Sequence, residues 1–108
     1  MDDYSEAAIG SPRNRIYQVT NLEVATILAV ADRTEQATSF EDLIYRESEV
    51  DALWSLCDIQ VKQAQINDSP ELPKWLALRE KLWRAHDLIP EGEVAESAAV
   101  LRSIPEIL

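Results

Sequence analysis

EVDALWSLCDIQVKQAQIN, residues 49–67, is the longest run of the sequence that keeps helical spacing without glycine or proline. Apolar side chains recur there at i, i+3, i+4, i+7, i+11 and i+14, which places them on one helix face. These residues are Val50, Leu53, Trp54, Cys57, Val61 and Ala64. Ala52, Ile59 and Ile66 repeat every seven residues on nearly the opposite side, with Leu56 between the two rows. A helix apolar over so much of its circumference is covered by neighbours on several sides or by another subunit, so this stretch predicts the central helix of an all-α domain.

A helix is also expected to follow Thr20 and to run to about Glu35. The preceding residues, TNLE, have capping-box spacing, with Thr20 as the N-cap and Glu23 reaching back to it. The run VATILAVA contains β-branched residues and would also suit a buried strand. Its length, its alanines and the cap favour a helix that ends near Glu35.

A short helix is expected between this element and the central one. Ser39 predicts an N-cap for a helix over 40–46, and Ser48 then predicts a separate cap for the central helix. The apolar residues of the short helix are expected to face inward. They are Phe40, Leu43 and Ile44.

Two more helices follow the central one. The sequence NDSP, residues 67–70, predicts a stop and a restart, because proline suits the first helical position. The next helix spans roughly 71–88 and ends at PEG, residues 90–92. The last runs from about 93 to 103, and Pro105 breaks it.

The N-terminal region has a different composition. Residues 1–12, MDDYSEAAIGSP, predict a flexible acidic tail. Residues 13–20 are either a short extended segment or a lead-in whose apolar side chains pack over the next helix, and the lack of an evident partner strand favours the lead-in. The chain has 108 residues and only two glycines, so residues 13–108 predict a single helical domain, a small four- to five-helix bundle.

The chain is strongly acidic, with a net charge of −10 and a pI near 4.4. This charge argues against direct nucleic-acid binding, which needs clustered lysine and arginine, and against binding to an anionic membrane. Several acids gather between Asp32 and Asp51 and predict an acidic surface that either is merely solvated or meets a basic protein. The acidic surface expected here consists of Glu41, Asp42, Glu47, Glu49 and Asp51.

No motif in the sequence specifies a reaction. The chain has one cysteine, Cys57, and one histidine, His86, which is too few soft ligands for a tetrahedral metal site. Cys57 is expected to be a buried structural thiol, and His86 a half-buried side chain with its bonds satisfied. No phosphate-binding glycine loop and no nucleophile elbow occurs. We therefore expect no catalytic residue, no cofactor and no metal.

Trp75, Arg79 and Trp83 form the most distinctive local pattern, because they stand at i, i+4 and i+8. This spacing lets the guanidinium group lie between the two indoles. Tryptophan and arginine are enriched where partners dock, which favours a binding site. The same pattern also suits a core edge, with the arginine stem covering the tryptophans.

The expected function is a non-enzymatic helical protein-interaction module, regulatory or adaptor in kind, that forms a homodimer through apolar helix faces. Its partner-binding residues are predicted to be Leu56, Ile59, Ile66, Trp75, Arg79 and Trp83. The alternative is an acidic inhibitor that binds a basic, nucleic-acid-binding protein by charge mimicry. The acidic N-terminal sequence lacks the basic and apolar regions of a leader, so a cytoplasmic location is expected.

Overall fold

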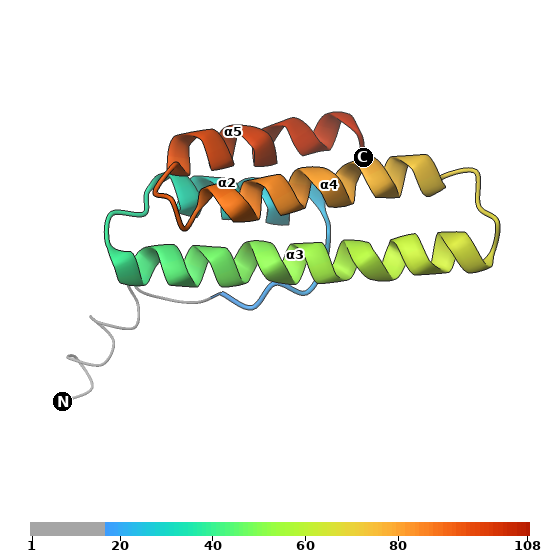
Figure 1. Ribbon diagram of the computed structural model, residues 1–108, viewed down its shortest axis with the longest axis horizontal. Coiled ribbons are helices and arrows are strands. Elements are labelled where there is room, and N and C mark those ends of the chain that lie inside the picture. The colour runs from blue at the N-terminus through green and yellow to red at the C-terminus, as the bar shows by residue number, and fades with distance from the viewer. Residues whose placement is uncertain (1–16) are drawn as a thin grey trace.

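The computed structural model describes residues 17–108, and these residues form four α-helices, a short 3-10 helix and no strand (Figure 1). The predicted all-α class is confirmed for this part of the chain, whereas the predicted tail over 1–12 lies outside the described residues. The elements are α2 (Val24–Glu35), α3 (Phe40–Ile66), α4 (Leu72–Leu88), α5 (Val94–Ser103) and η2 (Ile104–Glu106).

The four helices pack around one core. Figure 1 shows α3 and α4 side by side and antiparallel, with α5 on the far side of α4 and α2 behind. The closest packing joins α3 to α4 and α2 to α5, and α4 also contacts α5. Towards the turn that joins them, α3 and α4 extend beyond α2 and α5 (Figure 1). The fully buried apolar residues are Ile27, Val30, Ala31, Val50, Leu53, Cys57, Val61, Leu78, Leu82, Ala85, Ile89, Ala98, Leu101 and Ile104, and all but Val61 form one cluster.

The predicted break before the central helix is wrong, because α3 is continuous from Phe40 to Ile66. Ser39 does cap this helix, since its Oγ accepts a hydrogen bond from the amide of Asp42 at 3.0 Å. Ser48 lies inside the helix, and its hydroxyl donates to the carbonyl oxygen of Ile44 at 3.1 Å. No glycine or proline separates the two predicted helices, so the backbone keeps its hydrogen bonds through Ser48.

The continuous helix also changes which residues face inward. Phe40 is 79% exposed and Ile44 is 44% exposed, whereas Leu43 packs against the core. The longer C-terminal part of α3 determines which face of the helix is buried. When this face is followed toward the N-terminus of the helix, polar residues lie on it and are buried. These buried polar residues are Asp42, Arg46 and Glu49.

The start of α2 also differs from the expectation. The helix begins at Val24, and Glu23 occupies the cap position without a side-chain capping bond. Asn21 supplies the local contacts, because its Oδ1 accepts from the amide of Glu23 and from the hydroxyl of Thr26. Residues 17–23 form no regular structure, but Val19 packs against the core, as expected for a lead-in.

The helices after the central one agree with the sequence interpretation. α4 and α5 occupy the predicted ranges, and Ser69 accepts a hydrogen bond from the amide of Glu71 at 3.1 Å just before α4. At the C-terminus Ile107 packs against the core, while Leu108 remains 38% exposed.

Candidate interaction site

Five of the six predicted partner-binding residues line two separate grooves along the α3–α4 pair, and the sixth, Ile66, lies outside both. On α3, Trp54 lines one groove and Leu56 lines the other. Their side chains point in nearly opposite directions, because two residues along a helix correspond to a rotation of about 200°. Arg79 and Trp83 line the groove on the Trp54 side, whereas Trp75 lines the groove on the Leu56 side. The predicted residues therefore do not form one continuous patch.

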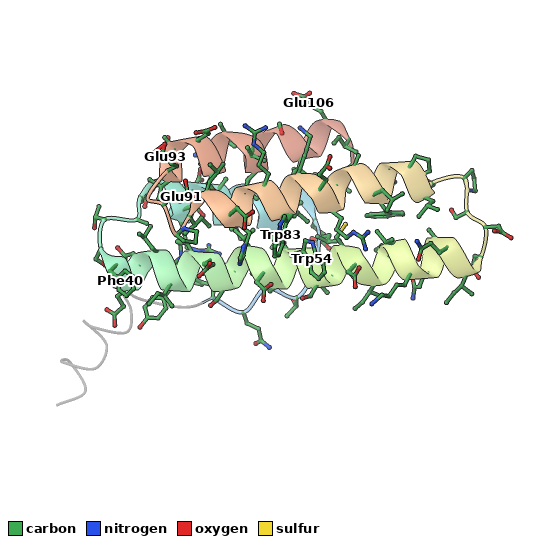
Figure 2. All side chains as sticks on the ribbon, viewed as in Figure 1. Phe40, Trp54, Trp83, Glu91, Glu93 and Glu106 are labelled. Atoms are coloured by element: carbon green, nitrogen blue, oxygen red, sulfur yellow. The ribbon has the colours of Figure 1, made fainter. Side chains whose placement is uncertain are left out.

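The first groove is named here the tryptophan groove and has a volume of about 690 Å³. Figure 2 shows Trp54 and Trp83 between α3 and α4, and their ring centroids lie 5.9 Å apart at 57°. Trp83 also stacks on His86, with centroids 5.0 Å apart, yet it remains 49% exposed. Trp54 was not predicted as a groove residue, because its spacing in the sequence fits the core face equally well. The groove is lined by Trp54, Leu76, Ala77, Arg79, Glu80 and Trp83.

The predicted sandwich of Arg79 between two indoles does not form. Arg79 Nη1 lies 2.5 Å from Asp58 Oδ1 on α3. Asp58 also lies 2.9 Å from Nζ of Lys62. The hydrogen bond from Lys62 and, to a lesser degree, the one from Arg79 lower the pKa of the Asp58 carboxyl. The ring of Trp75 is covered instead by Lys74, whose Nζ lies 4.6 Å from the centroid. Spacing within α4 identified neighbours on one helix but not the acid that faces Arg79 from α3.

The second groove is named here the outer groove and has a volume of about 370 Å³. It lies between the residues that precede α2 and the α3–α4 pair. Ile59, which lines it, is 51% exposed, and Ile66, two turns further along α3, is 81% exposed. All of its lining residues are uncharged: Thr20, Asn21, Leu22, Leu56, Ile59, Gln60 and Trp75.

The predicted acidic surface is only partly at the surface. Glu41 and Asp51 are exposed, and Glu47 is partly exposed, with Oε2 3.5 Å from Nε2 of His86. Asp42 and Glu49 are each 1% exposed, so their assignment to the surface is corrected. Asp42 was misplaced because the predicted break at Ser48 left the phase of the first turns of α3 undetermined. Glu49 was misplaced because the sequence did not show that Arg33 and Arg46 pair with it inside the molecule.

Glu49 is the centre of a buried ionic cluster. Its carboxylate lies 3.0 Å from Arg46 Nη2 and 3.1 Å from Arg33 Nε, and it accepts the backbone amide of Tyr17 at 3.0 Å. Arg33 also lies over the ring of Tyr17, at 4.2 Å from the centroid. Burial lowers the pKa of the Arg46 guanidinium, and the negative charge of Glu49 opposes this change. The cluster joins the segment before α2 to α2 and α3, and this position indicates a structural role.

Cys57 lies in the core, and its thiol donates to the backbone oxygen of Trp75 at 3.4 Å. Burial raises the pKa of the Cys57 thiol to about 11, so little nucleophilic thiolate forms at neutral pH. Among residues 17–108, no three histidine, cysteine or acidic side chains cluster in a way that could hold a metal ion. None of the helices in this range combines the length and the apolar composition that a membrane span requires.

Cys57 is expected to react slowly with thiol reagents in the native protein. Raising its pKa from 9.0 to about 11 lowers the thiolate fraction at pH 8 by about 100-fold, and the closed core slows access further. The check is the time course of labelling by an aromatic disulfide reagent, with and without a denaturant. Similar rates in both conditions would contradict the burial of this thiol.

Comparisons of the chain with protein-family models, with curated proteins and with solved structures find no match. Functional inference therefore rests on the two grooves and on the charges around them.

Proposed function

We propose that the chain is a non-enzymatic protein-interaction module that forms a homodimer through the outer groove and the adjoining face of α3. One observation carries this proposal. In a chain with a net charge of −10, the outer groove is lined by uncharged residues alone, and two isoleucines, Ile59 in the groove and Ile66 two turns beyond it, stand exposed on α3. Large exposed apolar side chains gathered on one face are typical of an interaction surface.

The charges favour a second copy as the partner on this face. Two chains of −10 repel each other, and like charges placed across an interface are costly. A twofold contact sets the same patch against itself, and a patch without charge avoids that cost. The lining of the outer groove meets this condition, and Thr20, Asn21 and Gln60 supply uncharged polar groups for its rim. The one cation between Ile59 and Ile66 on α3, Lys62, has its charge paired with Asp58 at 2.9 Å.

The spacing of the two isoleucines suits an antiparallel pair of α3 helices. Ile59 and Ile66 are seven residues apart, or about 10 Å along the helix axis. A twofold axis midway between them exchanges the two positions. Ile66 of one copy then reaches the outer groove of the other, beside Leu56 and Ile59.

Replacing Ile59 and Ile66 together by glutamate is expected to convert the dimer to a monomer. Full burial of an isoleucine contributes about 1.5–3 kcal/mol, so losing both in each copy weakens association by more than about 100-fold. The measurement is solution mass by light scattering at low and high salt. The matched control is Phe40→Glu, because Phe40 is 79% exposed but lies at the opposite end of α3. A monomeric wild-type chain, or a double variant that remains dimeric, would overturn the proposal.

The alternative, an acidic inhibitor that imitates nucleic-acid phosphates, loses support on its predicted surface. Asp42 and Glu49 are buried, and Glu47 lies beside His86. Glu41 and Asp51 remain exposed, but they stand ten residues apart on α3. This alternative predicts a complex that weakens steeply with salt and depends on these acids.

A further inference from the structure

The tryptophan groove differs from the outer groove in its charge. Asp51 precedes Trp54 by three residues on α3, and on α4 Glu80 and Asp87 stand three residues before and four residues after Trp83. Residues three or four apart on a helix are surface neighbours, so each acid flanks one of the two indoles. All three acids are exposed. The aromatic floor of the groove therefore has an acidic rim.

The cations near this groove do not neutralise the rim. Arg79, which lines the groove, and Lys62 both bind Asp58, so these three side chains together carry one positive charge against the three negative charges of the rim. Within residues 17–108, neither Asp51 nor Glu80 forms an ion pair, and Asp87 has only His86, with Oδ1 3.6 Å from Nδ1. The rim consequently keeps a net negative charge.

We propose that the tryptophan groove binds a basic amphipathic helix of a partner protein. The groove follows the seam between two antiparallel helices, and such seams receive the apolar face of a third helix. Its apolar side chains contact Trp54, Leu76 and Trp83. Its lysines or arginines meet Asp51, Glu80 and Asp87, and Trp83, which is 49% exposed, offers its aromatic ring beside them.

Charge separates this occupant from a second copy of the chain. Two tryptophan grooves set against each other would bring their acidic rims together, which the outer groove avoids. The proposal is independent of dimer formation, because the two grooves lie on opposite sides of the α3–α4 pair.

The test uses the full chain and a synthetic helical peptide of leucine and lysine, with leucines at i, i+3, i+4 and i+7. The first control peptide carries glutamate in place of every lysine, and the second has the same composition in scrambled order. Binding is followed by tryptophan fluorescence and by calorimetry. We expect only the amphipathic basic peptide to bind strongly, and with an affinity that falls as salt rises. Equal binding of the acidic or the scrambled peptide, or absence of binding, would overturn the proposal.

Variants place the peptide on the groove. Trp83→Ala is expected to weaken binding by at least about tenfold, as for an interface hot spot, whereas Ile66→Ala on the other face leaves it unchanged. Asp51→Asn with Glu80→Gln is expected to weaken binding several-fold. The matched control is Glu91→Gln with Glu93→Gln, which removes the same number of charges at the end of the bundle, away from the tryptophans (Figure 2). We expect this control to have little effect on peptide binding.

The two double variants, at Asp51 and Glu80 and at Glu91 and Glu93, still test the binding site if Trp83→Ala proves unstable. These four acids are exposed, and their replacement by amides conserves size. Equal effects of the two acid pairs would show that net charge alone attracts the peptide, and would overturn the proposal.

Discussion

Replacing Glu49 by alanine is expected to lower the free energy of unfolding by about 3–5 kcal/mol, the cost of removing one partner from a buried ion pair. Glu49 is 1% exposed and binds the fully buried Arg46 at 3.0 Å, so the replacement leaves a guanidinium in the interior without its strongest counter-charge. The backbone amide of Tyr17 and the side chain of Arg33 also lose Glu49 as their hydrogen-bond acceptor. The measurement is denaturant unfolding followed by circular dichroism at one protein concentration, because association also shifts stability.

Two further variants identify the cause of this loss. Glu41→Ala removes an exposed acid from the same helix and is expected to change stability by less than about 0.5 kcal/mol. Arg46→Met combined with Glu49→Leu replaces the pair by apolar groups and is expected to recover much of the stability lost in Glu49→Ala. A single variant as stable as the wild type would contradict the buried cluster.

Replacing Ser48 by proline is expected to destabilise the chain by about 3 kcal/mol or more. Ser48 lies in the interior of α3, where proline removes a backbone hydrogen bond and its ring meets the carbonyl of Ile44. The same measurement of unfolding applies. If α3 were instead interrupted at Ser48, as the capping pattern predicts, the replacement would cost far less, so a small effect would contradict the continuous helix.

Phe40→Pro is the matched control for this prediction. Phe40 is the first residue of α3, where proline fits because no intrahelical bond is lost. The preceding Ser39 has φ −129° and ψ 162°, an extended conformation that proline tolerates in its neighbour. We expect this variant to remain within about 1 kcal/mol of the wild type.

Much of the fold followed from local pattern. Periodicity and the residues NDSP and PEG located α4 and α5, because apolar spacing and proline act over a few residues. Local capping was a weaker guide. Ser39 and Ser48 have the same capping chemistry, yet only Ser39 caps the start of a helix. At Ser48 the helical hydrogen bonds continue, and the hydroxyl bonds to the carbonyl oxygen one turn earlier.

The candidate site depended more on contacts between elements. The sequence identified Ile59, Ile66 and Trp83 as surplus apolar residues, and the structure leaves each of them about half exposed or more. It did not show that Ile59 and Trp83 belong to two different grooves, or that Ile66 lies outside both. That separation arises because α4 covers one side of α3 and the residues before α2 reach the other.

By itself, then, the sequence determined the helical class, the ends of α4 and α5, and the supply of apolar side chains beyond the needs of the core. These properties depend on residues within a few turns of one another. Only the tertiary structure decided the partners of Glu49 and Arg79 and the surface on which each isoleucine and tryptophan lies. Those outcomes depend on the phase in which two helices meet, and pairs such as Asp58 and Arg79 are brought together only by packing.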